Sequence, residues 1–142
     1  DFCPSIRPRF LGLQCGMSIG HIRASLDKIG LRAGQPTGSY LKPLLSSLQS
    51  ELEELTEKLY QGVDRGLFTN TPAEMFKLRI DLAELAQRAS NQELESSGGH
   101  AYLLDKPTGF ARRWREAAFI PVITPSVSQL RGELAKHEKT LA

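Results

Sequence analysis

Cysteine, tryptophan and long apolar runs are scarce in this chain of 142 residues. The two cysteines, Cys3 and Cys15, do not have the spacing of a metal-binding CxxC pair. They could close a loop in a secreted protein, but no signal segment precedes them, which favours two reduced thiols. The longest apolar run, 117–123, has seven residues, whereas a membrane-spanning helix needs about 20. The sequence therefore predicts no membrane segment.

Catalytic and metal-binding motifs are equally scarce. His21, His100 and His137 are far apart, and none has a histidine, cysteine or acidic partner at a ligating interval. The chain has no G-x-S-x-G nucleophile motif, and no glycine-rich loop followed by lysine that could hold nucleotide phosphates. We therefore expect a protein that is not an enzyme and that holds no metal and no cofactor.

Charge is distributed unevenly along the chain, although the formal net charge is only +2. Residues 1–42 contain six basic and two acidic side chains, and residues 100–142 contain seven and four. Residues 43–99 have the opposite balance, with five basic and ten acidic side chains. The composition, 40% hydrophobic and 24% charged, is typical of a soluble globular domain. We expect a cytoplasmic protein and, because the chain begins with Asp1 rather than Met, a processed product or a fragment.

Residues 1–39 hold six of the 12 glycines and three of the eight prolines. Because proline disfavours helix at its own position and at the preceding one, the first ten residues predict an extended basic arm. One short helix is predicted over 18–29, with Gly30 as its stop, because Ile19, Ile22, Leu26 and Ile29 share one face. The glycines at positions 12, 16 and 20 could let helices approach closely, but we interpret them as flexible connection.

Helical periodicity dominates from residue 40 onward. A leucine stripe steps alternately by four and three residues, and consists of Leu41, Leu45, Leu48, Leu52, Leu55 and Leu59. A second apolar series runs over 75–89, after a capping-box start at Thr71 and Glu74, and a third runs over 127–141. No segment alternates convincingly as a strand does. We therefore predict an all-α antiparallel bundle of three long and two or three short helices over 40–142, preceded by the arm over 1–39.

The segment TGFARRWREAAF, residues 108–119, contains the single tryptophan and allows two interpretations. On a helix its apolar side chains share one side, as in a helix docked on a core, except that Phe119 projects to the polar side. Alternatively its arginines bind phosphate, because guanidinium groups match phosphate oxygens bidentately. The predicted binding residues are Lys106, Arg112, Arg113, Trp114 and Arg115 with Arg7 and Arg9 of the arm, and Arg23, Lys28 and Arg32 could extend them.

Two functions follow from these patterns. The first is a nucleic-acid-associated accessory protein that uses the basic groups and base stacking on Trp114 or Phe119. The second is a protein–protein interaction or scaffold domain of a larger assembly, in which the leucine stripe packs against another helix, within the chain or in a homo-oligomer. The stripe is short, which favours packing within the chain. Nucleic-acid binding should weaken with salt, whereas assembly through leucines should depend on concentration.

Overall fold

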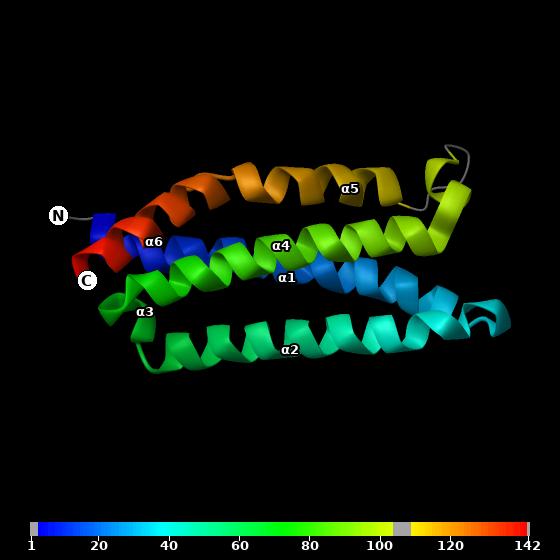
Figure 1. Ribbon diagram of the computed structural model, residues 1–142, viewed down its shortest axis with the longest axis horizontal. Helices are drawn as coiled ribbons and strands as arrows, with labels where there is room; N and C mark the ends of the chain where they lie inside the picture. Colours follow the sequence, from blue (N-terminus) through cyan, green and yellow to red (C-terminus); the bar gives the residue numbers. More distant parts are fainter. Residues whose placement is uncertain (1–2, 104–108, 142) are drawn as a thin grey trace.

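The computed structural model describes residues 3–103 and 109–141, with side chains for residues 8–103 and 109–137. This part of the chain is almost entirely helical and contains no strand, which confirms the predicted all-α bundle. The long helices are α1 (Cys3–Ala33), α2 (Lys42–Asp64) and α4 (Pro72–Ser97), and shorter ones are α5 (Phe110–Phe119) and α6 (Val127–Leu141). Figure 1 shows α1 and α4 running in one direction, with α2 and α5 antiparallel to them on opposite sides.

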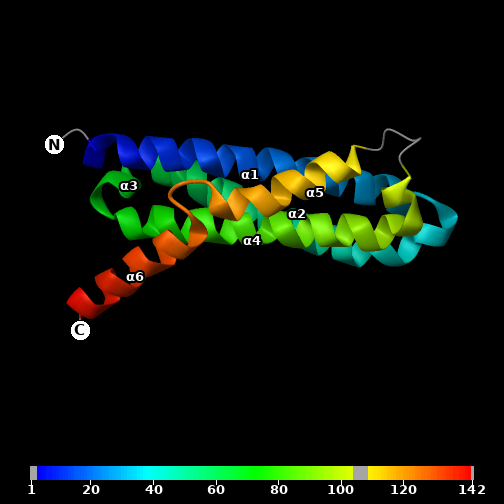
Figure 2. The same ribbon diagram turned by 90° about the horizontal axis from the view of Figure 1, so that it is seen from above.

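Short helical segments make the connections. The 3-10 turn η1 (Pro36–Leu41) leads from α1 into α2, and α3 (Leu67–Asn70) joins α2 to α4. After α4 the chain forms η2 (Gly98–Tyr102), and η3 (Ile120–Val122) links α5 to α6. Seen from above, α5 lies along α1 and α4, whereas α6 diverges from the bundle (Figure 2).

The prediction of an extended arm is wrong. Cys3–Ala33 forms a single helix of 31 residues instead of an extended segment followed by a short helix over 18–29. Pro4 lies in the first turn, where no backbone partner is missed, and Pro8 removes only one helical hydrogen bond. Against this loss, α1 packs more extensively on α4 than any other pair of helices packs. Tertiary burial therefore overrides the local preferences of proline and glycine.

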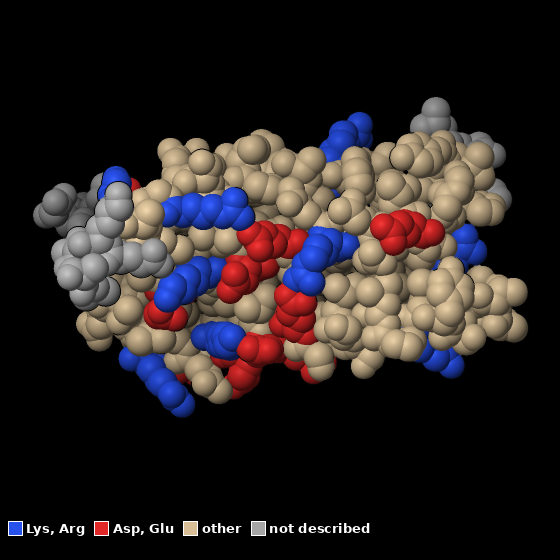
Figure 3. Space-filling model, in the orientation of Figure 1, with Lys and Arg blue, Asp and Glu red and all other residues tan. Residues whose placement is uncertain are grey.

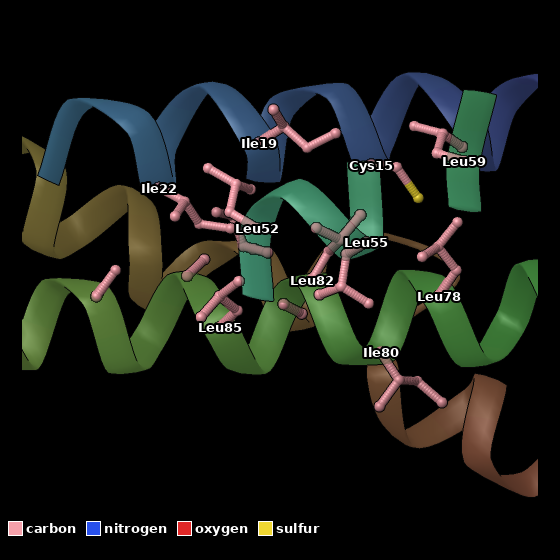
Figure 4. Packing of buried hydrophobic residues seen from close by; sticks show 14 of the residues in the cluster. Cys15, Ile19, Ile22, Leu52, Leu55, Leu59, Leu78, Ile80, Leu82 and Leu85 are labelled. Atoms are coloured by element: carbon pink, nitrogen blue, oxygen red, sulfur yellow. The ribbon is translucent and has the colours of Figure 1, made fainter. Parts of the chain in front are cut away.

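The core lies between α1, α2 and α4. In Figure 4, Leu52, Leu55 and Leu59 of α2 lie among side chains of α1 and α4. These three leucines and Leu48 are each at most 6% exposed, and Leu41 is 7% exposed. Leu45 is partly buried against the same cluster. The leucine stripe therefore packs within the chain, as its short length favours, and its leucines are not available as a surface for another molecule.

Helix α4 begins where the sequence predicts, but the predicted capping hydrogen bonds do not form there. Helix α4 begins at Pro72 as predicted, yet the Thr71 side chain makes no capping hydrogen bond. Glu74 instead accepts a hydrogen bond from Lys77 at 3.1 Å. A capping box forms at the start of α6, where the Ser126 N–H donates to Gln129 Oε1 at 2.7 Å and the Gln129 N–H donates to Ser126 Oγ at 3.2 Å.

The turn from α2 to α4 depends on two glycines. A Cβ atom at Gly62 would lie 2.2 Å from the ring of Phe68, so this position has no room for a side chain. Gly66 adopts a φ of 63°, which residues with a side chain rarely tolerate. Together they let α3 fold back and bury Phe68 in the core.

Candidate anion-binding site

Helix α5 is an amphipathic helix docked on α1 and α4. Phe110 and Ala117 are buried on its inner side, whereas Arg112, Arg115 and Phe119 are exposed. Trp114 is exposed, at 39%, and its ring centroid lies 5.7 Å from that of Phe110. The spacing thus predicted the buried positions of Phe110 and Ala117 and the outward position of Phe119. Trp114 and Ala118, which the same spacing placed on the apolar side, are exposed instead.

Arg113 is the arginine of α5 that points inward. Its Nε donates to Glu93 Oε2 at 3.0 Å, and its Nη2 donates to Glu93 Oε1. The Arg113 side chain is 13% exposed and that of Glu93 is 2% exposed. This bidentate pair joins α5 to α4, and it fixes the guanidinium of Arg113 in one orientation.

The other predicted binding residues do not converge on Arg113. Arg112 donates to Glu116 at 2.7 Å on the surface of α5, and Arg115 is exposed beside it. Arg9 is exposed on α1, about 18 Å along the helix from His21, the residue that approaches α5. The Arg7 side chain and Lys106 lie outside the described residues.

Arg113 instead lines a pocket that two basic residues of α1 also line. This open pocket of about 290 Å³ lies where the C-terminal ends of α1 and α4 meet η2 and α5. The pocket is lined by Lys28, Leu31, Arg32, Gln35, Glu93, Ser97, His100, Ala101, Phe110 and Arg113. Lys28 and Arg32 are two of the three residues that the sequence suggested only as an extension of the predicted binding residues, and they line this pocket together with Arg113. Arg23, the third, lines a different pocket.

Positive charge prevails in this pocket, which we call the basic pocket. Among the described residues that line it, Glu93 is the one carboxylate, and it is bound by Arg113. Arg32 donates from Nη2 to the backbone oxygen of Ser97 at 3.2 Å, which holds its guanidinium at the pocket wall. Phe110 adds an aromatic wall. The arrangement suits an anion.

A second polar cluster lies where α1, α4 and α5 meet. His21 Nε2 and Ser90 Oγ are 2.7 Å apart, and Glu116 Oε2 is 4.0 Å from His21 Nδ1. The order serine, histidine, carboxylate resembles an acyl-transfer triad. However, the His21–Glu116 separation is longer than a hydrogen bond and Ser90 is 1% exposed. Burial lowers the pKa of His21, and Glu116 partly opposes this effect. These contacts serve chiefly to hold the three helices together.

Arg79 is the largest polar side chain in the interior and is fully buried. Its Nε donates to Gln14 Oε1 at 2.9 Å, and its Nη2 donates to the backbone oxygen of Ile120 at 2.6 Å. Gln14 in turn donates to the backbone oxygen of Thr124 at 2.8 Å. Arg79 thus connects α4 to α1 and to the segment after α5. The sequence does carry a signal for this interior position, because residue 79 lies four residues after Met75 and three before Leu82.

The part of the chain that the structure describes shows neither a metal cluster nor a membrane span. No three of its histidines, cysteines and acidic residues come together as metal ligands. None of its helices is both long enough and apolar enough to cross a bilayer. The basic pocket is therefore the arrangement with the most definite chemistry.

No family model, curated protein or solved structure matches this chain.

Proposed function

We propose that this protein is a non-catalytic helical module that binds phosphate-bearing ligands, with single-stranded nucleic acid as the ligand class, through the basic pocket. One observation carries the proposal: Lys28 and Arg32 of α1 line a pocket in which Glu93, the one carboxylate among the described lining residues, is already paired with Arg113 of α5. Lysine and arginine side chains bind phosphate oxygens through charge-assisted hydrogen bonds. Because Arg32 and Arg113 are each held by a partner, little side-chain freedom is lost when a ligand binds.

Surfaces around the pocket favour nucleic acid over a small anion. Exposed Arg112 and Arg115 continue the positive charge along α5. Trp114 is 39% exposed, and Tyr102, at the end of η2, is 71% exposed. Aromatic side chains beside a basic groove are the arrangement by which proteins bind single strands without sequence preference, because every base has a face that can stack.

The emission of Trp114 provides the test. The Trp114 ring contacts that of Phe110 in a tilted arrangement, and Phe110 lines the basic pocket, so a ligand there should change the surroundings of the single tryptophan. We expect a short single-stranded oligonucleotide to quench this emission at low salt. Added salt should reverse the effect, with a slope of about 0.7 in log affinity per phosphate neutralised. An emission that no oligonucleotide alters, together with unchanged oligonucleotide anisotropy, would contradict the proposal.

Protein–protein interaction is the second candidate, although not through the leucine stripe. The stripe is buried, but large apolar side chains are exposed on α1, including Leu13 at 71% and Met17 at 56%. Exposed apolar surface of this kind marks contact sites between macromolecules. The proposed protein–protein contact surface is therefore the exposed face of α1, and not the leucine stripe from which the interaction was first predicted.

A further inference from the structure

The outer face of α1 exposes four large apolar side chains among the described residues. Phe10, Leu13, Met17 and Leu31 are 48%, 71%, 56% and 68% exposed, respectively. Figure 2 shows α1 along one long edge of the molecule, with α4 and α5 on its inner side. At 100° per residue, Leu13, Met17 and Leu31 lie within an arc of about 40°. Leu13 and Met17 are one turn apart, and Leu31 lies on the same side near the C-terminal end of α1; we call this side of α1 the stripe.

Side-chain size changes along this stripe. Its N-terminal half carries the large residues Phe10, Leu13 and Met17, whereas Gly20 and Ala24 follow in the C-terminal half. A Cβ atom at Gly20 would meet nothing within 4 Å, so this position is an open depression. Between Phe10 and Ala24 large side chains therefore precede small ones, which makes this part of the stripe complementary to its own reversed copy, whereas Leu31 lies beyond it.

Charge shows the same reversal. Arg9 and Asp27 are both exposed, and they stand about five turns apart, so they lie on the same side of α1. One is basic and precedes the large apolar residues, and the other is acidic and follows the small ones. If a second α1 lies antiparallel across the first, each arginine therefore faces an aspartate.

We propose that two copies of this chain pair through α1, antiparallel, about a two-fold axis at the level of residues 18 and 19. Met17 then packs over the partner's Gly20, and Leu13 packs over the partner's Ala24. Arg9 pairs with the partner's Asp27. Because the interface is isologous, each contact occurs twice.

The antiparallel arrangement is the one that the stripe favours. A parallel pair would place Arg9 against the partner's Arg9 and leave Gly20 facing the partner's Gly20 across a void. Both effects destabilise an interface, through like-charge repulsion and lost packing. One helix face buries less than the roughly 800 Å² per partner of a standard interface, so the dimer dissociates on dilution.

Sedimentation velocity over a range of protein concentrations tests the pairing. The unmodified chain should sediment as a monomer when dilute and as a dimer when concentrated. Leu13→Glu should abolish the dimer, because it places a charge twice in the apolar interface. Leu13 is 71% exposed, so the variant should keep its helical circular dichroism. Val63→Glu, at a 59% exposed position on α2, is the matched control and should leave dimerisation unchanged.

A charge exchange tests the direction of pairing. Arg9→Asp should weaken the dimer, because two carboxylates then face each other at each end, and the double variant Arg9→Asp with Asp27→Arg should restore it. A chain that stays monomeric at all concentrations overturns the proposal. A dimer that Leu13→Glu leaves intact overturns the assignment to α1. Failure of the double variant to recover overturns the antiparallel register.

Discussion

At the scale of single residues, polar side chains enclosed between helices position α5. His21 contacts Ser90, Glu93 is bound by Arg113, and Arg79 donates to the backbone before α6. Each of these contacts joins elements that are distant in the sequence. A buried polar group that loses its partner destabilises the fold by about 1–3 kcal/mol, so these residues are sensitive positions.

Stability should fall on the acid side of neutrality because of His21. Burial lowers its pKa from the ordinary value of 6.5; Glu116 and Glu93 oppose this shift and Arg113 adds to it. As the pH falls below 6.5, the unfolded chain binds a proton at this histidine before the folded chain does, so the free energy of unfolding decreases.

Urea titrations of the unmodified chain and of His21→Gln, at about pH 7.5 and about pH 5.5, measure this effect. The unmodified chain should lose up to roughly 1 kcal/mol more than the variant between the two pH values. Equal losses in both proteins would show that His21 does not titrate differently on folding.

Cys15 should be chemically inert in the folded protein. It is a free thiol with no exposed surface, and burial raises its pKa to about 12. Because the thiolate is the reactive form, alkylation should require unfolding. In a Cys3→Ser background, iodoacetamide should modify Cys15 only when urea unfolds the chain. Rapid modification of the native protein would contradict the burial of this thiol.

At the scale of helices, the periodicity of apolar residues predicted which helix faces are buried. The leucine stripe, apart from the partly buried Leu45, and the series from Met75 to Ala89 are buried as their spacing indicates. The face of Ile19, Ile22, Leu26 and Ile29 was also identified, but the extent of α1 was not. The local preferences of proline and glycine argue against a helix over the first residues. Packing against α4 stabilises the helix from Cys3 to Ala33, and a local sequence pattern does not reveal this tertiary contact.

Leu52 and Leu13 offer a comparison of inner and outer helix faces. Leu52 is 6% exposed between α1 and α4, whereas Leu13 is 71% exposed. Leu52→Ala should lower the free energy of unfolding by about 2–5 kcal/mol, because it leaves a cavity. Leu13→Ala, measured on dilute protein, should change it by less than about 0.5 kcal/mol. Equal effects in urea denaturation would refute the assignment of inner and outer faces.

Docking of α5 should depend on Glu93. Glu93→Gln keeps the size of the side chain but leaves the guanidinium of Arg113, which is 13% exposed, without its bidentate carboxylate. Breaking a buried pair in this way destabilises a protein by about 3–5 kcal/mol. We expect α5 to loosen and Trp114 emission to shift to longer wavelength before the global transition in urea. A single transition with unchanged native emission would show that the pair does not hold α5.

At the scale of the whole molecule, folding brings basic residues beside acidic ones that are distant in the sequence. The acidic middle of the sequence is partly neutralised, because Arg88 pairs with Glu51 and Arg131 pairs with Glu84. Figure 3 shows basic and acidic side chains interleaved over this face. The cations of the basic pocket lie instead at the end where α1 meets η2.

The candidate site was only partly predictable from the sequence. Arg113 was named, and Lys28 and Arg32 were included as an extension. His100 and Glu93 were not identified as pocket residues. Their roles depend on where α4 ends and on how α5 returns along it, and neither is contained in the spacing of one helix. The orientation of Arg113 toward Glu93 likewise follows from docking, since isolated helix geometry places it only at the border of the apolar side.

The central claim, that the basic pocket binds phosphate, is tested most directly by two variants of equal charge. Lys28→Gln with Arg32→Gln removes two cations from the pocket, whereas Lys58→Gln with Arg65→Gln removes two exposed cations from α2 and the turn after it. The measurement is the anisotropy of a labelled single-stranded oligonucleotide titrated with each protein. The account predicts that the pocket variant loses affinity by about tenfold or more, since a charged hydrogen bond contributes about 1.5–3 kcal/mol, while the control binds nearly as the unmodified chain does. Equal losses in the two variants would show that net charge, and not this pocket, attracts the ligand.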